Sequence, residues 1–347
     1  LIMRIAPDTN LEQIKTGKFV SIMGHNYTFF SLITDLKLEV THPDILLFPP
    51  SQEDILLNSL LKEWNIYATA TLKPMLILGN DKRPQPVKTI PPHFAPVHET
   101  KKEDIALIFG DEKNPNRRYF TIGTPLDMDA PICLDLDRLT ERSNGIFGKT
   151  GTGKTFLTRL VLAGLIKNEK AVNLIFDMHS EYGLQARKEG NNQAFVKGLK
   201  TLFADRVAIF SLDPASTRRR GGNPDVEIMI PYQAIQVEDI LSLENELHLH
   251  ATALEAAYLI AAKYKRDWLA ALLENGENIK EFAQNLGAHP ESIAALYRKL
   301  KRIEHLPFFT PIKPGTSYRN ESVIDRMIEY LDRNISVIVE FGNYTST

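Results

Sequence analysis

A glycine-rich octapeptide limits the fold of this chain more than any other feature. Residues 148–155 read GKTGTGKT, which fits the pattern G-x-x-x-x-G-K-[ST]. The short apolar run at 145–147 precedes the octapeptide, and residues 156–167, apolar on most faces, follow it. This order predicts a buried strand, a tight turn and a helix packed against a sheet. The centre of the chain is therefore expected to be an α/β domain.

The octapeptide has the residue types that a phosphate-binding loop needs. Its glycines let backbone N–H groups point inward around a β-phosphate, and the following helix N-terminus favours an anion. Lys154 is predicted to reach the β- and γ-phosphates, and the Thr155 hydroxyl to hold Mg²⁺. A chance glycine-rich turn is the alternative, but the flanking strand and helix match the motif's usual context. The predicted ATP-binding residues are Gly148, Lys149, Thr150, Gly151, Thr152, Gly153, Lys154 and Thr155.

The segments after the octapeptide alternate between strand-like and helical patterns. Residues 171–176, 207–212 and 226–230 are predicted strands, with a helical stretch at 193–203 between the first two. This alternation is typical of a parallel sheet. Residues 238–304 are helical almost throughout and predict a helical insertion. A helix at 322–332 and a strand at 335–339 then return to the sheet.

The first 130 residues contain short strand-like runs without long helical patterns. Leu36, Leu38 and Val40 alternate with charged residues, as in a half-buried antiparallel strand. Further runs at 66–78, 105–109 and 119–122 complete a pattern that suggests a small barrel or sandwich. Five prolines between 84 and 96 predict a loop or an extended crossover. The predicted domains are a β-barrel at 1–130, an ATPase core at 131–235, the helical insertion at 236–312 and a return to the core at 313–347.

Composition excludes several other classes of protein. The 347 residues are 43% hydrophobic and 24% charged, which suits folded domains rather than disorder. Lys and Arg number 41 against 43 Asp and Glu, so any nucleic-acid contact must come from a local patch. The one cysteine, Cys133, fits a reducing cytoplasm, and no apolar run is long enough to span a bilayer. Because the chain begins with Leu1 and stops after a strand-like run, it is expected to be part of a longer polypeptide.

A second polar motif follows the predicted strand at 171–176. Asp177 and Glu181 lie where an α/β sheet presents residues to its ligand. Either carboxylate is a candidate to hold Mg²⁺ or to polarise the attacking water. The alternative is a polar turn in which Asp177 caps a helix. His179 has no second His or Cys at ligand spacing, which argues against a zinc site.

Together the two motifs resemble those of a known family. The run from Ile146 to Thr155, followed by Asp177-x-His179-x-Glu181-Tyr182, is similar to the HerA group of the HerA/FtsK ATPases. The resemblance implies a hexameric DNA translocase with an N-terminal β-barrel, a RecA-like core and a helical insertion, using ATP and Mg²⁺. It also implies a partner, either a nuclease of the NurA type in DNA-end resection or a sirtuin-like or nuclease effector in antiviral defence.

The same resemblance bears on the remaining catalytic groups. The family's acidic strand supplies a catalytic glutamate, and a neighbouring subunit supplies an arginine. Glu340 ends a strand that could be this acidic strand or the one before it; on the second reading, which we prefer, the catalytic glutamate lies beyond Thr347. Arg142 matches a basic residue that senses nucleotide across subunits, with an ordinary surface arginine as the alternative.

Basic residues outside the motifs suggest contacts with DNA. Arg218, Arg219 and Arg220 are predicted to lie in a flexible loop facing a hexamer channel, or else in a solvated hairpin tip. Residues 282–302 have helix-turn-helix spacing, which two helices of any bundle can share. A nucleotide-controlled scaffold for an effector enzyme is the alternative to a motor. The chain lacks the N-K-x-D string of GTPases and the L-S-G-G-Q-like signature of ABC ATPases.

Overall fold

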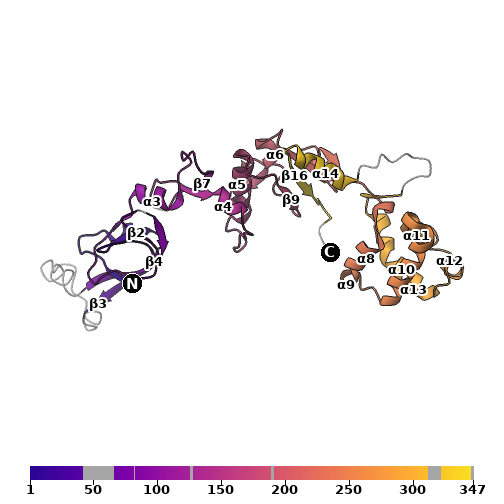
Figure 1. The fold of residues 1–347 in the computed structure, drawn as a ribbon, viewed down its shortest axis with the longest axis horizontal. Helices are drawn as coiled ribbons and strands as arrows, with labels where there is room; N and C mark the ends of the chain where they lie inside the picture. The colour runs from indigo at the N-terminus through magenta and orange to yellow at the C-terminus, as the bar shows by residue number, and fades with distance from the viewer. Residues whose placement is uncertain (42–65, 82, 126–127, 189–190, 312–321, 345–347) are drawn as a thin grey trace. The chain divides into compact units, whose positions relative to one another are not determined.

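The computed structural model describes residues 1–41, 66–81, 83–125, 128–188, 191–311 and 322–344. Contacts between residues divide the chain into two compact units, Leu1–Ile146 and Phe147–Thr347. Each unit has hydrophobic clusters of its own. Figure 1 labels many of the helices and strands of both.

An antiparallel sheet dominates the first unit. Its strands are β1 (Ile2–Arg4), β2 (Phe19–Met23), β3 (Thr28–Val40), β4 (Ile66–Leu78), β5 (Pro84–Pro86) and β6 (Val97–Glu99). They pair in the order β1-β4-β3-β2-β6, with β5 also on β4. Val20, Ile22, Phe29 and Leu72 fill a core on this sheet. Leu36 packs against that core as predicted, but Leu38 is 76% exposed, so the outer end of β3 is less covered than its alternating pattern indicated.

One sequence prediction in this unit is wrong. Residues 105–109 form part of the helix α3 (Lys102–Phe109) and not a strand. Ile105, Ile108 and Phe109 recur at helical spacing and pack beside Phe30, while Glu103 and Asp104 favour the positive N-terminus of a helix. The proline-rich segment was predicted to be a loop or an extended crossover; its first residues form the short strand β5, which suits an edge position, and the rest is a loop with a turn at 93–94.

The first unit ends in a small hairpin. β7 (Tyr119–Gly123) pairs antiparallel with β8 (Ile132–Asp135), and β8 leads into α4 (Leu136–Thr140). A short 3₁₀ helix, η1 (Leu11–Gln13), lies earlier in the same unit. Asp135 caps α4 by accepting hydrogen bonds from the Asp137 and Arg138 amides. Cys133 is buried in β8.

A parallel sheet forms the centre of the second unit, as predicted. Its strands are β9 (Leu174–Asp177), β12 (Val207–Ser211), β13 (Val226–Glu227) and β16 (Ser336–Glu340), in the order β13-β12-β16-β9. Glu340 is in register with Asp177 on one side and with Ser211 on the other. The carboxyl ends of three neighbouring strands thus bring three polar side chains to one edge of the sheet.

Helices cover both faces of this sheet. On one face, Leu162 and Ile166 of α5 (Lys154–Lys167) pack with Val207 and Ile338. On the other, α14 (Val323–Asp332) packs against Val337, Val339 and Phe210. Because alternate residues of a strand face opposite helices, the two central strands β12 and β16 are buried throughout, whereas Leu174 and Phe176 of the edge strand β9 are exposed. The α/β class predicted from the sequence is therefore confirmed.

Three local predictions in this unit differ from the structure. Residues 193–203 are not one helix: β11 (Asn191–Val196) pairs with β10 (Ala186–Lys188), and only α6 (Leu199–Leu202) is helical. The predicted strand at 226–230 is split into β13 and β14 (Ile230–Pro231), the latter paired with β15 (Phe309–Thr310). Residues 145–147 form no strand, and the Phe147 side chain is 93% exposed. Three residues without a ladder partner cannot hold a strand, whatever their apolar character.

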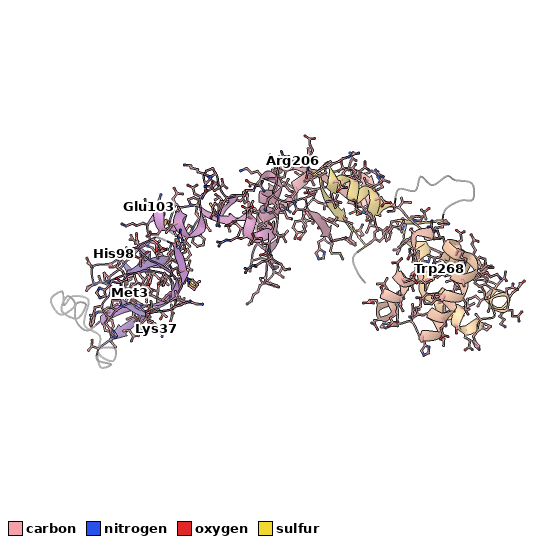
Figure 2. The ribbon with its side chains drawn as sticks, in the orientation of Figure 1. Met3, Lys37, His98, Glu103, Arg206 and Trp268 are labelled. Atoms are coloured by element: carbon pink, nitrogen blue, oxygen red, sulfur yellow. The ribbon has the colours of Figure 1, made fainter. Side chains whose placement is uncertain are left out.

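The predicted helical stretch after residue 236 is helical throughout most of its length. The short η2 (Tyr232–Ala234) precedes it. The stretch itself comprises α8 (Val237–Ser242), α9 (Glu244–Leu247), α10 (Ala251–Tyr264), η3 (Lys265–Asp267), α11 (Trp268–Glu274), α12 (Ile279–Leu286), α13 (Pro290–Leu300) and η4 (Lys301–His305). Trp268, labelled in Figure 2, is buried at the centre of their shared core. Its indole N–H donates to the carbonyl of Ile235 at 2.9 Å, so the one polar atom of this ring is satisfied.

Candidate nucleotide-binding site

The octapeptide folds into a tight loop that only glycines permit at three points. Gly151 and Gly153 have φ of +80° and +87°, in the left-handed region that disfavours other residues. A Cβ on Gly148 would lie 2.5 Å from the Thr152 hydroxyl oxygen. The loop is therefore a cradle of bare backbone, as a bound phosphate chain requires.

The predicted phosphate-binding lysine lies inside this loop. Lys154 Nζ and the Thr152 hydroxyl both donate to the Lys149 carbonyl, each at 2.7 Å. A phosphate oxygen carries more charge than a carbonyl oxygen and is the stronger acceptor for an ammonium group. The first turn of α5 contains no acidic residue, so the positive end of its dipole is uncompensated. Both features suit an anion at this point.

Glu181, rather than Asp177, lies beside the predicted metal-binding hydroxyl. The Thr155 hydroxyl donates to Glu181 Oε2 at 2.9 Å. A hydroxyl and a carboxylate oxygen are the ligands that Mg²⁺ prefers, taken directly or through water. These two side chains would therefore hold a Mg²⁺ ion, which would supply positive charge against the charge that develops during phosphoryl transfer.

Asp177 does not contact the Thr155 hydroxyl, as a metal ligand beside it would; its carboxylate binds backbone amides instead. Its carboxylate is 1% exposed and accepts hydrogen bonds from the Glu181 amide at 2.9 Å and the Tyr182 amide at 2.8 Å. The carboxylate thus fixes the turn after β9, as the capping alternative predicted, although the residues that follow form a turn and not a helix. Asp177 contributes to the site by placing Glu181.

Sequence reasoning missed Arg159, a buried residue of α5 whose side chain contacts the turn after β9. It lies one helical turn after Thr155 on α5, and its guanidinium donates to the Glu181 carbonyl. Burial lowers the pKa of Arg159, opposed by the charges of Glu181 and Asp177. Burial likewise raises the pKa of the neighbouring Tyr182. The sequence signal for Arg159 is its position four residues after the motif threonine, on a mostly apolar helix, which places it on the same face as Thr155.

The basic residues predicted to bind DNA lie on the last turn of a helix and directly after it, instead of in a flexible loop. Pro214–Arg219 form α7, capped by the Asp213 side chain. Arg218 pairs with Glu227, and both side chains are about half exposed. Arg219 is exposed, whereas Arg220 forms an ion pair with the buried Glu340. Proline at the first helical position and the Asp213 cap explain why this segment is helical.

Glu340 and Arg142 have contrasting surroundings. Glu340 is fully buried, and its carboxylate accepts from Arg220 at 2.5 Å and from the Thr217 hydroxyl at 2.9 Å. Arg142 belongs to the first unit, where its side chain is exposed and its carbonyl accepts from the Asn144 side chain. The proposed sensing role of Arg142 stays a prediction.

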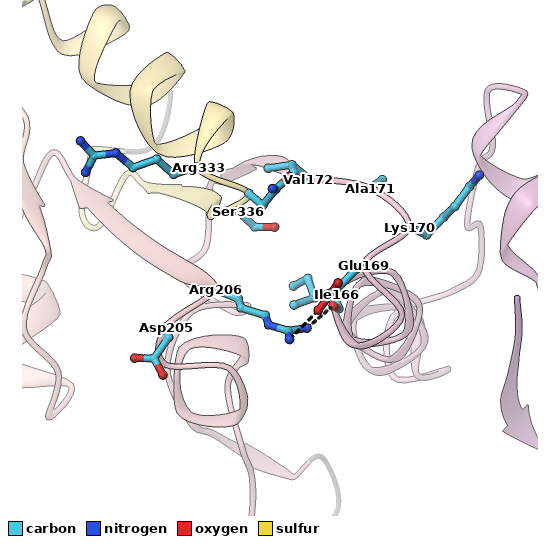
Figure 3. Close-up of a pocket in the computed structure, with 10 residues that line it drawn as sticks. Ile166, Glu169, Lys170, Ala171, Val172, Asp205, Arg206, Arg333 and Ser336 are labelled. Carbon is cyan, nitrogen blue, oxygen red and sulfur yellow. Dashed lines mark hydrogen bonds and ion pairs between the residues drawn. The ribbon is translucent and has the colours of Figure 1, made fainter.

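A cavity of about 430 Å³ opens at the opposite edge of the parallel sheet (Figure 3). Its lining includes Ser336 and Arg206, which lie at the amino ends of β16 and β12. Arg206 Nη2 pairs with Glu169 at 2.6 Å across this opening. No residue of the octapeptide lines the cavity, so the nucleotide site is defined by its loop and not by this hollow. Within the described ranges, no group of three or more His, Cys, Asp or Glu is placed to hold a metal ion, and no helix could cross a membrane.

A parallel α/β sheet with this loop and this hydroxyl–carboxylate pair defines a P-loop nucleotide-binding protein. Residues 120–347 match the family model described as the central domain of the helicase HerA. The match covers more than half of the chain, which therefore belongs to the HerA family, as its motifs suggested. Membership implies an ATP-hydrolysing P-loop motor domain of the HerA/FtsK type, a group that generally uses ATP and Mg²⁺. No curated protein matches the chain.

The loop geometry leads to a first prediction. Gly153→Ala places a Cβ on a residue with φ of +87°, which costs about 1–3 kcal/mol. We expect ATP affinity to fall about tenfold or more, measured by titration with a fluorescent ATP analogue. Gly287→Ala, at φ of +67° beyond the end of α12, meets the same open space and serves as the control. Equal affinity for both variants would contradict the assigned role of Gly153.

Proposed function

We propose that this protein is an ATP-dependent hexameric DNA translocase that works with a nuclease or another effector. The observation that carries the proposal is the contact between Thr155 and Glu181 at the mouth of the P-loop. It supports a site prepared for Mg²⁺ and a triphosphate, and the HerA family supports coupling of hydrolysis to a motor. DNA-end processing and antiviral defence are the two settings that fit such a motor.

In this proposal each motif residue has one task. The backbone of residues 148–155 holds the phosphates, and Lys154 moves from the Lys149 carbonyl to the β- and γ-phosphates. Thr155 and Glu181 hold Mg²⁺, while Asp177 keeps Glu181 in place. The neighbouring subunit of the hexamer supplies Arg142, whose exposed side chain is available for this contact.

The proposed architecture has three parts. The antiparallel sheet of the first unit serves as a small β-barrel for subunit or partner contacts, with the ATPase core after residue 131. The helices from α8 to η4 form an insertion into that core, which resumes with α14; the predicted boundary at 312–313 lies outside the described residues. Light scattering with nucleotide present is expected to give the mass of a hexamer, and a monomer under those conditions would count against this arrangement.

Arg219 is the arginine of its cluster that is best placed to meet DNA. It is exposed on the last turn of α7, and Arg218 beside it is held only by a surface ion pair, which is weak. We expect Arg219→Ala to weaken duplex DNA binding and to reduce the slope of log affinity against log salt by about 1. Fluorescence anisotropy across a salt series measures both. An unchanged slope would remove Arg219 from the DNA path.

A scaffold that assembles an effector without rapid translocation is the second candidate. Displacement of a third strand from a triplex on linear duplex DNA separates the two, because only a moving motor strips it. We expect ATP-dependent displacement by the full-length protein and none by Lys154→Ala. Nucleotide-dependent assembly without displacement would favour the scaffold.

A further inference from the structure

We propose that Arg220 and Glu340 form a positioning pair for the nucleotide site, holding the turn that presents Glu181 to Thr155. The inference rests on the proposed function, because it concerns the Mg²⁺-ATP site itself. It also gives Arg220 a task other than the DNA contact predicted from the sequence.

The pair is buried and closely matched. Glu340 is 0% exposed at the end of β16, and the Arg220 side chain is 28% exposed. Arg220 Nη2 donates to Glu340 Oε2 at 2.5 Å, and Nη1 lies 3.5 Å from Oε1, so the two groups face each other side by side. The Thr217 hydroxyl donates to the same Oε2 at 2.9 Å. A carboxylate held by this many donors fixes the guanidinium in one orientation.

The guanidinium also reaches the turn after β9. Arg220 Nη1 donates to the carbonyl of Ser180 at 3.2 Å. The amide on the other side of that peptide bond belongs to Glu181 and donates to Asp177 Oδ1 at 2.9 Å. Because a peptide unit is planar, fixing its oxygen and its N–H at once fixes its orientation. Arg220 and Asp177 therefore hold the 180–181 peptide from opposite sides.

This peptide needs holding because its backbone is strained. Ser180 has φ of +55°, which a non-glycine residue adopts only when its surroundings impose it. Without Arg220 the 180–181 peptide keeps only its amide contact with Asp177, and we expect it to turn and relieve the strain. Glu181 would then lose its approach to the Thr155 hydroxyl, now 2.9 Å away. The ion pair at the end of β16 thus fixes the position of Glu181 beside the Thr155 hydroxyl.

Two further observations favour a positioning task over a purely structural one. A Cβ on Gly183 would lie 2.7 Å from Glu340 Oε1, so the chain after Glu181 passes directly against the carboxylate.

Independently of Arg220, Asp213 fixes α7 to the end of β16. Its carboxylate accepts from the Ser216 amide at 2.9 Å and from the Asn343 side chain at 2.8 Å. Burial opposes the charge of Asp213, but these hydrogen bonds outweigh it and lower its pKa. Removal of Arg220 therefore leaves α7 anchored.

The test compares full-length wild-type protein with Arg220→Gln, Glu340→Gln, the double variant and Arg220→Lys. For Arg220→Gln we expect kcat to fall at least about tenfold and the Mg²⁺ concentration for half-maximal ATPase to rise at least about fivefold. ATP affinity without Mg²⁺ is expected to stay within about twofold, since Lys154 and the loop backbone are untouched. The double variant is expected to lose no more than Arg220→Gln, because both changes break one pair. Arg220→Lys is expected to restore part of the activity.

The matched control is Arg333→Gln, which breaks a pair with Glu329 on the exposed side of α14. It is expected to leave kcat and Mg²⁺ dependence within about twofold of wild type. Wild-type protein without Mg²⁺-dependent turnover would overturn the proposed function and the catalytic task of the pair with it. Turnover that Arg220→Gln preserves would overturn the pair alone. Loss of Mg²⁺-free ATP binding together with a collapse of Tm in Arg220→Gln would also overturn it, by showing a structural pair only.

Discussion

Lys154→Ala is expected to lower kcat/KM for ATP hydrolysis at least about 100-fold. The Lys154 ammonium lies within the phosphate-binding loop, 2.7 Å from the Lys149 carbonyl oxygen. Lys154 is the first residue of α5, whereas Lys149, the other lysine of the loop, lies before the helix. In the proposed mechanism Lys154 would stabilise charge on the transferred phosphate, and loss of one such donor removes about 10²–10³ in rate. Steady-state phosphate release measures the effect.

The fold should survive this substitution. The Lys154 side chain is not part of a hydrophobic cluster, and alanine is the best helix former at the start of α5. Lys263→Ala on α10 makes the same chemical change far along the chain, where the ammonium donates to the Asn285 carbonyl. That variant is expected to keep wild-type turnover. Normal activity in Lys154→Ala would place the hydrolytic site elsewhere.

Asp177→Asn and Glu181→Gln are expected to damage the site in different ways. Asp177 is buried, and its two oxygens accept from two amides, so the neutral side chain leaves one amide facing an NH₂ group. This costs about 2 kcal/mol of unfolding free energy, or about 4–8 °C in Tm. Glu181 contacts Thr155 with its side chain and is expected to lose about tenfold in apparent Mg²⁺ affinity with little change in Tm.

Differential scanning calorimetry and a Mg²⁺ titration of ATPase activity separate these two residues. The turn-anchor role of Asp177 requires that Tm falls in Asp177→Asn and holds in Glu181→Gln. A stable Asp177→Asn protein with a large Mg²⁺ shift would instead make Asp177 the metal ligand, as the sequence alone allowed.

Local patterns predicted the features that depend on neighbours in sequence. The loop at 148–155, the helix after it and the buried strands at 207–212 and 335–339 each follow from a short run of residues, and the structure contains all of them. The family followed from the same motifs. Two local signals compete at residues 105–109, which have both β-branched character and helical spacing. The acidic residues before them favour the helix, which the structure contains.

The remaining features depend on contacts between distant residues. Asp177 and Glu181 are equally acidic in sequence, and only the folded turn shows that one binds backbone amides and the other the Thr155 hydroxyl. Arg220 and Glu340 are separated by 120 residues, so nothing local distinguishes Arg220 from its two neighbours in the arginine run. The strand predicted at 145–147 failed for the related reason that a strand requires a partner, which no local pattern supplies.

The central claim is that this chain hydrolyses Mg²⁺-ATP at its P-loop in response to DNA. Steady-state ATPase activity of the full-length protein, with and without linear duplex DNA and beside Lys154→Ala, tests it most directly. We predict Mg²⁺-dependent turnover that duplex DNA stimulates and that Lys154→Ala lacks. Turnover that ignores DNA, or that persists in Lys154→Ala, would contradict the claim.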